Sequence, residues 1–419
     1  MSFNTALSGL RAANQDLSVT GNNIANASTT GFKKSRTEFG DVYATSLLGT
    51  GSRTPGSGVL VNQIAQQFDQ GNINITNNSL DLAINGNGFF ILNNQGSPEY
   101  TRSGNFGLDN QGYIVSATKA RLQGFAASPS GQILSGALSD LRIQTQDISP
   151  NATTKVDLRI NLDSGSTVPA VAIPTPLPTS LDPTQYNWST AATVYDSLGN
   201  PHTLTTYYAK TTPTAAGTNW DVYTSLDSNG LHNLGSVSFD TNGALLGATP
   251  AGGAFSATPS LPDTWPAPGG ASTMNFTVDL AASTQFGSDS TVSSLDQDGY
   301  APGRLASVNI DDSGVVFARY TNGQALTLGQ VALANFANPQ GLVPVGNTAW
   351  AESFDSGQPV VGAPQSGSRG SVQSGALEDS NVDISSELVN LILAQRNYQA
   401  NAKTIETDNA VTQTIINLR

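Results

Sequence analysis

The chain has 419 residues and a formal net charge of −13, from 18 Lys and Arg against 31 Asp and Glu. This length exceeds the roughly 250–300 residues at which single hydrophobic cores stop growing, so two or three domains are expected. The acidic balance opposes binding to nucleic acid or anionic lipid, and no apolar run is long enough for membrane insertion. The chain contains no Cys, which excludes disulfides and thiolate metal sites.

The first predicted element is a helix in the N-terminal region. None of the 21 Pro residues lies before Pro55 or after Pro364, so both ends of the sequence are free to be helical. Apolar residues recur every seven positions from residue 3, and this spacing predicts a helix with one narrow apolar seam. We expect the helix to stop before Gly31. The predicted seam consists of Phe3, Leu7, Leu10, Leu17 and Ile24.

The middle of the chain has a hydrophobic period of two, which is typical of half-buried strands. Alternation is clearest at residues 156–162, 220–226 and 274–280. Short Asn-, Asp- and Gly-rich turn signals separate such stretches and predict hairpins. Two stretches rich in Pro, Gly or Ala, residues 168–183 and 247–270, are expected to be linkers or long loops.

The second predicted helix lies in the C-terminal region and repeats the heptad pattern over about 34 residues. Asn381 or Asp383 can cap its start, and Glu387 suits the positive end of the helix dipole. The predicted seam consists of Ile384, Leu388, Leu391, Tyr398 and Ile405. Both helices could pack on the β-rich body as ordinary amphipathic elements. A strict seven-residue seam is narrower than the stripe of a globular surface helix, and this favours pairing between the helices and with neighbouring chains.

The search for catalytic and cofactor motifs gives no match. The sequence has no Walker A, GxGxxG, HExxH or GxSxG motif. Its two histidines, His202 and His232, follow turn signals and are expected in exposed loops. A pair of acidic residues for glycoside hydrolysis has no support beyond their abundance. We therefore expect a protein that is not an enzyme and that binds no metal or other cofactor.

Two sequence motifs near the ends resemble the opening and closing motifs of the bacterial flagellar rod and hook proteins. The first comprises residues 8–10, 21–26 and 29–33, and the second comprises residues 380–384, 387–388 and 395–401. Segments at 82–90, 100–106, 194–200 and 328–336 resemble the hook members of this family. The matching motif residues are Asn22, Asn23, Asn26, Gly31, Phe32, Gln395, Arg396 and Asn401.

The resemblance implies a nested fold: a mainly β body with α-helical termini, coiled-coil-like terminal helices, and a middle β domain with an inserted outer β domain. The implied inner assembly domain comprises residues 1–67 and 375–419. The middle domain would comprise 68–155 and 298–374, and the outer domain 156–297.

The resemblance also implies a function. The family's hook members form a curved helical tube outside the cell that transmits torque from rod to filament as a universal joint. The implied partners are many copies of the same chain, the distal rod protein, the hook cap, the hook–filament junction protein, the hook-length control protein and the flagellar type III export apparatus. The sequence opens without a basic n-region or apolar h-region, so export without a cleaved signal peptide is expected.

Two other functions stay open at this point. A distal rod subunit belongs to the same family, but rods are expected to lack the inserted segment of roughly 140 residues. A secreted β-rich hydrolase or adhesin is the alternative from another class.

Overall fold

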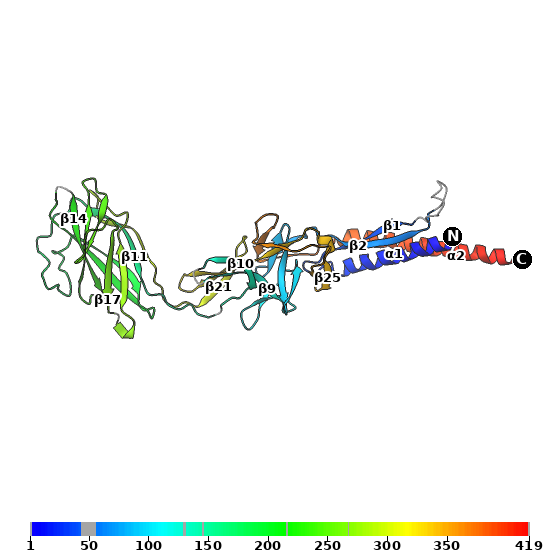
Figure 1. Ribbon diagram of the computed structural model, residues 1–419, viewed down its shortest axis with the longest axis horizontal. Coiled ribbons are helices and arrows are strands. Elements are labelled where there is room, and N and C mark those ends of the chain that lie inside the picture. The colour runs from blue at the N-terminus through cyan, green and yellow to red at the C-terminus, as the bar shows by residue number, and fades with distance from the viewer. Residues whose placement is uncertain are drawn as a thin grey trace. The chain divides into compact units, whose positions relative to one another are not determined.

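The computed structural model describes residues 2–42, 56–128, 131–144, 146–214, 217–266 and 268–417. Within them the chain is mainly β, with the α-helices α1 (Ser2–Ala25) and α2 (Ile384–Asn417) near its ends (Figure 1). Unit 1 contains Met1–Thr145, Ala306–Arg319 and Ala325–Arg419, and unit 2 contains Gln146–Leu305 and Tyr320–Gln324. The prediction of a mainly β, nested chain with helical ends is confirmed.

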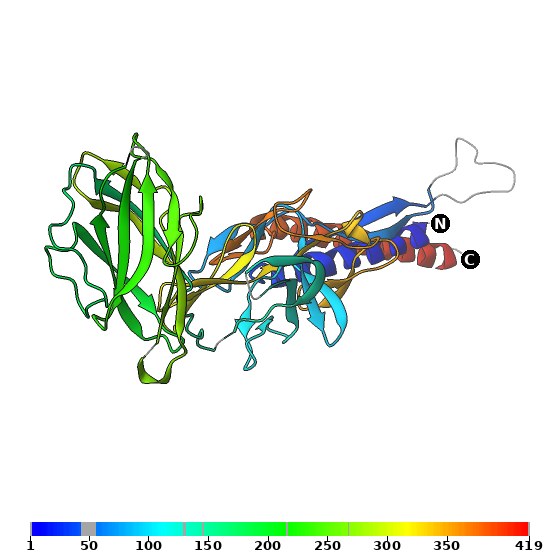
Figure 2. The same ribbon diagram turned by 60° about the vertical axis from the view of Figure 1, so that its left-hand side comes forward.

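In unit 1, α1 and α2 lie side by side (Figures 1 and 2). Asp383 caps the start of α2, because its side chain accepts a hydrogen bond of 2.7 Å from the backbone N–H of Ser386. These contacts lower the pKa of Asp383, with the Ser386 backbone hydrogen bond as the largest cause. The 34 residues of α2 confirm the predicted length of the second helix.

A β-hairpin follows α1 in sequence and packs on it. It consists of β1 (Ser35–Asp41) and β2 (Val59–Gln66), paired antiparallel. The expectation of an inner helical segment over residues 1–67 therefore covers more than helix, since α1 ends at Ala25. Residues 59–61, Val-Leu-Val, carry the high β propensity that favours a strand here.

The body of unit 1 is built around one large sheet of short strands. The main path of its largest sheet runs β21-β22-β23-β9-β5-β6-β26-β25, with β25 at one edge. Phe89, Tyr100, Phe336 and Trp350 fill its core, with edge-to-face ring contacts such as 4.8 Å between the centroids of Tyr100 and Phe336. The strands of the path are β5 (Phe89–Asn94), β6 (Ser97–Thr101), β9 (Arg121–Ala127), β21 (Leu305–Ile310), β22 (Val315–Tyr320), β23 (Ala325–Val331), β25 (Val343–Gly346) and β26 (Ala349–Ala351).

Shorter strands complete unit 1. Those attached to the same sheet are β7 (Gly107–Leu108), β8 (Ile114–Val115), β10 (Ile133–Asp140), β24 (Leu333–Asn335) and β27 (Val360–Gly362). Two separate pairs join segments that are distant in sequence: β3 (Ile73–Ile75) with β29 (Ala376–Glu378), and β4 (Leu82–Asn85) with β28 (Ser371–Ser374). These pairs tie the segment before α2 to the strands that follow β2.

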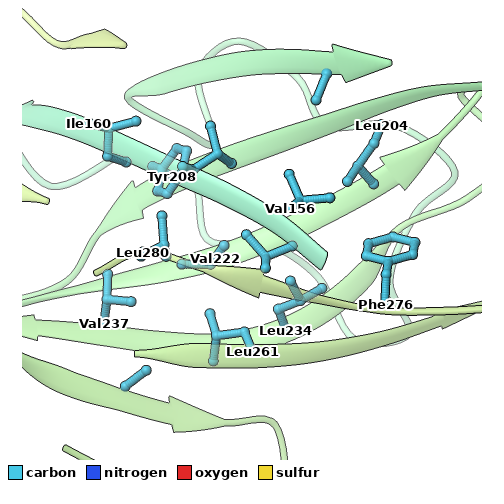
Figure 3. Packing of buried hydrophobic residues seen from close by; sticks show 14 of the residues in the cluster. Val156, Ile160, Leu204, Tyr208, Val222, Leu234, Val237, Leu261, Phe276 and Leu280 are labelled. Atoms are coloured by element: carbon cyan, nitrogen blue, oxygen red, sulfur yellow. The ribbon is translucent and has the colours of Figure 1, made fainter. Parts of the chain in front are cut away.

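Unit 2 contains two five-stranded sheets that share one hydrophobic core (Figure 3). Inward-facing side chains of β11 interleave with those of the second sheet, as the alternation at residues 156–162 predicts. The first sheet holds β11 (Lys155–Asp163), β17 (Ser260–Trp265), β18 (Met274–Asp279), β19 (Thr284–Phe286) and β20 (Thr291–Gln297). The second holds β12 (Trp188–Tyr195), β13 (Pro201–Lys210), β14 (Thr218–Leu226), β15 (His232–Phe239) and β16 (Leu245–Pro250).

One expectation about loops is wrong. The stretch 247–270 contains most of β16 and all of β17, although a long loop was predicted. In β17, Leu261, Asp263 and Trp265 are buried on one face, so the strand alternates as a sheet strand does. The Pro and Gly residues around it hid that alternation. The stretch 168–183 contains no strand, as predicted.

Candidate assembly surface

The two terminal helices form an antiparallel pair. Near one end of the pair, Asn23 of α1 donates a hydrogen bond of 3.3 Å to the carboxylate of Glu387 in α2. Further along, Gly9 lies against Asn401, and a Cβ at Gly9 would approach the Asn401 amide oxygen to 2.6 Å. Glycine therefore permits the close approach of α1 and α2 at this point.

The predicted seam residues are distributed unevenly over this pair. In α1 the buried positions are mostly small or polar, among them Ala6, Ala13 and Thr20, and Val19 is the larger apolar residue buried with them. Ala394 and Glu387 are the buried residues of the described part of α2. Of the predicted seam residues, Leu7, Leu10, Leu17, Ile24, Leu391 and Ile405 are half-buried, whereas Phe3, Ile384, Leu388 and Tyr398 are exposed. The intrachain contact thus leaves part of the predicted seam in solvent.

A second apolar surface lies on α2. Four large side chains near the start of the helix are each about half exposed: Leu388, Val389, Ile392 and Leu393. These four side chains lie on the side of α2 that faces away from the buried residues Glu387 and Ala394. A helix that keeps such a contiguous apolar face in water has unused capacity for contact with another helix.

The last turns of α2 extend beyond the start of α1. The contacts of Gly9 with Asn401 and of Asn23 with Glu387 place residue 2 of α1 opposite residue 408 of α2. Val411, Ile415 and Ile416 follow that position and are exposed. These apolar residues enlarge the α2 surface that the chain itself leaves uncovered.

A buried ionic cluster joins the helices to the β body of unit 1. The Glu378 carboxylate accepts a hydrogen bond of 2.6 Å from the Lys33 ammonium and one of 3.2 Å from the Arg102 guanidinium. The side chains of Glu378 and Lys33 are completely buried, and that of Arg102 almost so. Burial lowers the pKa of Lys33 and of Arg102, and the charge of Glu378 opposes both shifts. One carboxylate thus connects the segment after α1, the residue that follows strand β6 and the segment before α2.

Motif residues near this cluster fix the connections between helices and body. Asn23 exchanges two hydrogen bonds with the backbone of Ser35, at 2.8 and 2.9 Å. Gly31 has a φ of 69° and donates its N–H to the carbonyl of Glu378, while a Cβ there would collide with the Ser103 backbone. Asn381 accepts a hydrogen bond from the Lys34 N–H.

The remaining motif residues lie on or near the helix surface. Asn26 donates to the carbonyl of Asn22, which is exposed, and Phe32 is half-buried. Gln395 and Arg396 are exposed on α2, whereas Asn401 packs against Gly9. The structure therefore gives Asn23, Gly31 and Asn401 a packing role within the chain.

In unit 2, a buried histidine supports one of the motif segments. His202 lies in β13 and is 7% exposed, so the expectation of an exposed loop is wrong for this residue. Its ring contacts the carboxylates of Asp227 at 2.6 Å and Asp196 at 3.4 Å. Asp196 also accepts hydrogen bonds from the backbone N–H groups of Leu198 and Asn200, which closes the turn of the 194–200 motif. Sequence spacing could not show this because the partners come from different turns.

The second histidine also lies in a strand. His232 begins β15, contacts Asp263 at 2.9 Å and stacks on Trp265 with ring centroids 3.6 Å apart. Asp263 also accepts hydrogen bonds from Thr224 and from the indole N–H of Trp265. The carboxylate is fully used by these structural contacts. Among the described residues, no group of three His, Asp or Glu side chains is placed to hold a metal ion.

Comparison with protein families gives four matches along the chain. Residues 3–33 match the family described as Flagella basal body rod protein, and residues 83–168 match Flagellar hook protein FlgE/F/G D1 domain. Residues 161–300 match Flagellar basal body protein FlaE D2 domain, and residues 373–418 match Flagellar basal body rod FlgEFG protein C-terminal. The matches define a protein of the flagellar rod and hook class.

Similar proteins narrow the class. The chain is 37% identical to the flagellar hook protein FlgE of Escherichia coli over 100% of both chains. It is 32% identical to FlgE of Treponema pallidum over 99% of this chain and 98% of the relative. The crystal structure of Helicobacter pylori flagellar hook protein FlgE2 shares the fold, with a TM-score of 0.55 and 16% identity over 73% of this chain and 100% of that chain.

The chain belongs to the flagellar hook protein family, and it is a structural subunit of the hook. Proteins of this family form a homopolymeric hook in the flagellum. The chain is therefore located in the flagellar hook. The alternative of a distal rod subunit is not favoured, because the full-length relatives are hook proteins. Neither described helix has the length and apolar content of a membrane span.

Proposed function

We propose that copies of this chain assemble through the exposed apolar face of α2 into a curved tube that works as a universal joint. The observation that carries the proposal is the set of half-exposed side chains Leu388, Val389, Ile392 and Leu393 on a helix whose opposite face already contacts α1. A helix that packs against its partner on one side and is apolar on the other can bind helices of further copies without unfolding.

The proposal divides the chain into three layers. Residues 1–67 and 375–419 form the inner assembly layer, 68–155 and 298–374 the middle β layer, and 156–297 the outer β layer. The two compact units support a division near residues 146 and 305. The buried Glu378 cluster supports a firm connection between the inner and middle layers. Rotation of a bent tube takes each subunit repeatedly between its short and long sides, so the outer contacts must have alternatives of similar energy.

The proposed role is structural and needs neither catalysis nor a cofactor. The partners we propose are further copies of the chain, the distal rod protein, the hook cap, the hook–filament junction protein and the hook-length control protein. The flagellar type III export apparatus would deliver the chain to the cell exterior without cleavage of a signal peptide. The absence of Cys suits passage between reducing and oxidising compartments.

The test replaces one apolar residue of the α2 face. Ile392→Gln keeps good helix propensity but removes apolar surface, so tube formation should fail while the chain stays folded. Lys403→Gln is the matched control, because Lys403 lies exposed on the same helix and, within the described residues, its ion pair is with Glu406. Negative-stain microscopy of flagellar hooks would show tubes for the control alone. Normal tubes from Ile392→Gln would contradict the proposal.

A further inference from the structure

One aromatic side chain in unit 1 is completely exposed. Phe354 follows β26 and has 100% of its side-chain surface in water. Val343 and Val345, about half exposed, lie on the neighbouring edge strand β25, where Val343 pairs with Ala351. A fully solvated Phe close to a hairpin that carries two half-exposed Val side chains is a candidate contact surface.

The turn that carries Phe354 is held rigidly. The Ser353 hydroxyl donates to the Gly341 carbonyl at 2.5 Å and accepts the backbone N–H groups of Asp355 and Ser356. The Ser356 hydroxyl, which is buried, donates back to the Ser353 carbonyl at 2.9 Å. Binding through this turn would therefore order little new backbone, and this reduces the entropic cost of a contact.

A cleft lies at the opposite end of the same hairpin. The turn between β25 and β26, at Asn347 and Thr348, forms one wall of a cavity of about 740 Å³. Phe32, Ala117 and Pro344 contribute accessible apolar surface to this cleft, whereas Leu92 and Trp350, which also line it, are buried. Hydroxyl and amide groups surround them, and the main polar lining residues are Asn26, Thr30, Ser103, Asn105, Ser116 and Thr118.

We propose that Phe354 of one copy inserts into this cleft of a second copy. This inference rests on the proposed function of self-assembly and names a contact of the middle layer in addition to the α2 face. The phenyl ring meets the apolar part of the cleft, and the carboxylate of Asp355 meets hydroxyl and amide donors at its rim. The cleft bears no acidic residue among those that line it in the described part of the chain, so the charges do not oppose the fit.

The arrangement also has the symmetry that a tube requires. The donor turn and the receiving cleft are different surfaces at opposite ends of one hairpin, so the contact is head-to-tail. A head-to-tail contact can repeat without limit, and it generates a helix when the rotation does not close a ring. A self-complementary contact would instead stop at a dimer.

The experiment uses the absence of Cys in the chain. Hooks are assembled from the double variant Phe354→Cys with Thr118→Cys, oxidised, and run on a non-reducing gel. Thr118 lines the cleft and is exposed. Each copy then offers one thiol to each of two neighbours, so a ladder of linked oligomers is expected. The matched control pairs Phe354→Cys with Leu134→Cys, an exposed position of β10 outside the cleft, and should give no ladder.

A second variant tests the energetic role. Phe354→Ala should reduce the yield of tubes at least ~10-fold, as expected for an aromatic anchor, and Phe354→Leu should restore most of it. The melting temperature of the soluble chain should not change, because the Phe354 side chain is fully exposed.

Tubes that form normally from Phe354→Ala, or that form without a ladder, overturn this contact but leave self-assembly standing. A ladder of equal strength in the Leu134 control assigns Phe354 to another surface of the neighbour. Absence of tubes from the unaltered chain would instead reject the proposed function.

Discussion

Glu378 shows how much depends on one carboxylate in this chain. Its two oxygens receive Lys33, Arg102 and the backbone N–H of Gly71, and its own carbonyl receives the N–H of Gly31. Two buried cations share it, so its negative charge is required by both. The sequence shows Lys33 within the opening motif, but the pairing with a residue 345 positions away is a property of the fold.

We expect Glu378→Gln to destabilise unit 1 by about 3–5 kcal/mol, because it leaves two buried cations without a counter-charge. Urea unfolding followed by circular dichroism measures the change. Glu38→Gln is the control, since Glu38 pairs with Arg36 at the surface, and it should leave the unfolding free energy nearly unchanged. Equal stability of the two variants would show that the cluster contributes little.

His202 predicts a pH dependence in unit 2. Burial lowers its pKa, but hydrogen bonds to Asp227 and Asp196 outweigh burial, so the pKa lies above its ordinary value. At pH values below the ordinary pKa of His, the protonated ring makes its full contribution to stability. This contribution is lost as the pH rises through the higher pKa that His202 has in the folded chain.

As the pH rises above about 6.5, the ordinary pKa of His, the melting temperature should therefore fall more steeply for the unaltered chain than for His202→Gln. Tryptophan fluorescence is a suitable probe, because Trp188, Trp220 and Trp265 lie in unit 2. Identical slopes for both proteins would contradict the role assigned to His202.

Among the elements, the two helices are those that the sequence predicts best. Heptad spacing and the two candidate caps, Asn381 and Asp383, predict where α2 begins and how long it is, and the structure selects Asp383 as the cap. The same spacing could not divide the apolar positions between contacts inside the chain and contacts with other copies. Leu391 is half-buried, whereas Leu388 stays exposed, although both belong to the predicted seam. Strand β17 is not predicted for a different reason. An Asp is expected at the surface, but Asp263 is buried because it accepts hydrogen bonds from Thr224 and Trp265.

We expect Leu391→Pro to abolish tube formation, because proline removes a backbone donor and clashes with the preceding turn of α2. Because Leu391 is only half-buried within the chain, Leu391→Ala should weaken assembly by at most roughly 2 kcal/mol per site, the lower limit for a fully buried leucine. Electron microscopy and sedimentation measure assembly, and calorimetry measures the β body. If Leu391→Pro lowered the melting temperature of the β body substantially, the helix would serve mainly to stabilise that body.

In the whole molecule, nesting separates two compact units. The helices and the Glu378 cluster belong to unit 1, whereas unit 2 has a large sandwich core of its own that includes Trp220 and Phe276. A unit with its own core can be altered without loss of the other. Nesting was predictable from the flanking motifs, but the boundary near residue 146 was not, because strands of similar composition lie on both sides of it.

Replacement of residues 156–297 by a short Gly and Ser linker should still allow a tube to form. The tube should be straight or changed in curvature, because contacts at large radius change most when a tube bends. Microscopy of isolated hooks and a motility assay measure the two effects. A folded chain that forms no tube would show that the outer layer supplies essential cohesion, whereas a normally curved and motile hook would show that it does not control shape.

The entry and exit of unit 2 run side by side as paired backbone. Ile148 bridges Gly303, Asn151 bridges Tyr300, and β11 pairs with β20 from Val156 and Gln297 onward. Paired residues of antiparallel strands lie only about 5 Å apart at their Cα atoms. Any foreign domain whose own ends are this close could be grafted at this point without stretching the host chain. The hook subunit can therefore carry an enzyme or antigen at this point in place of unit 2.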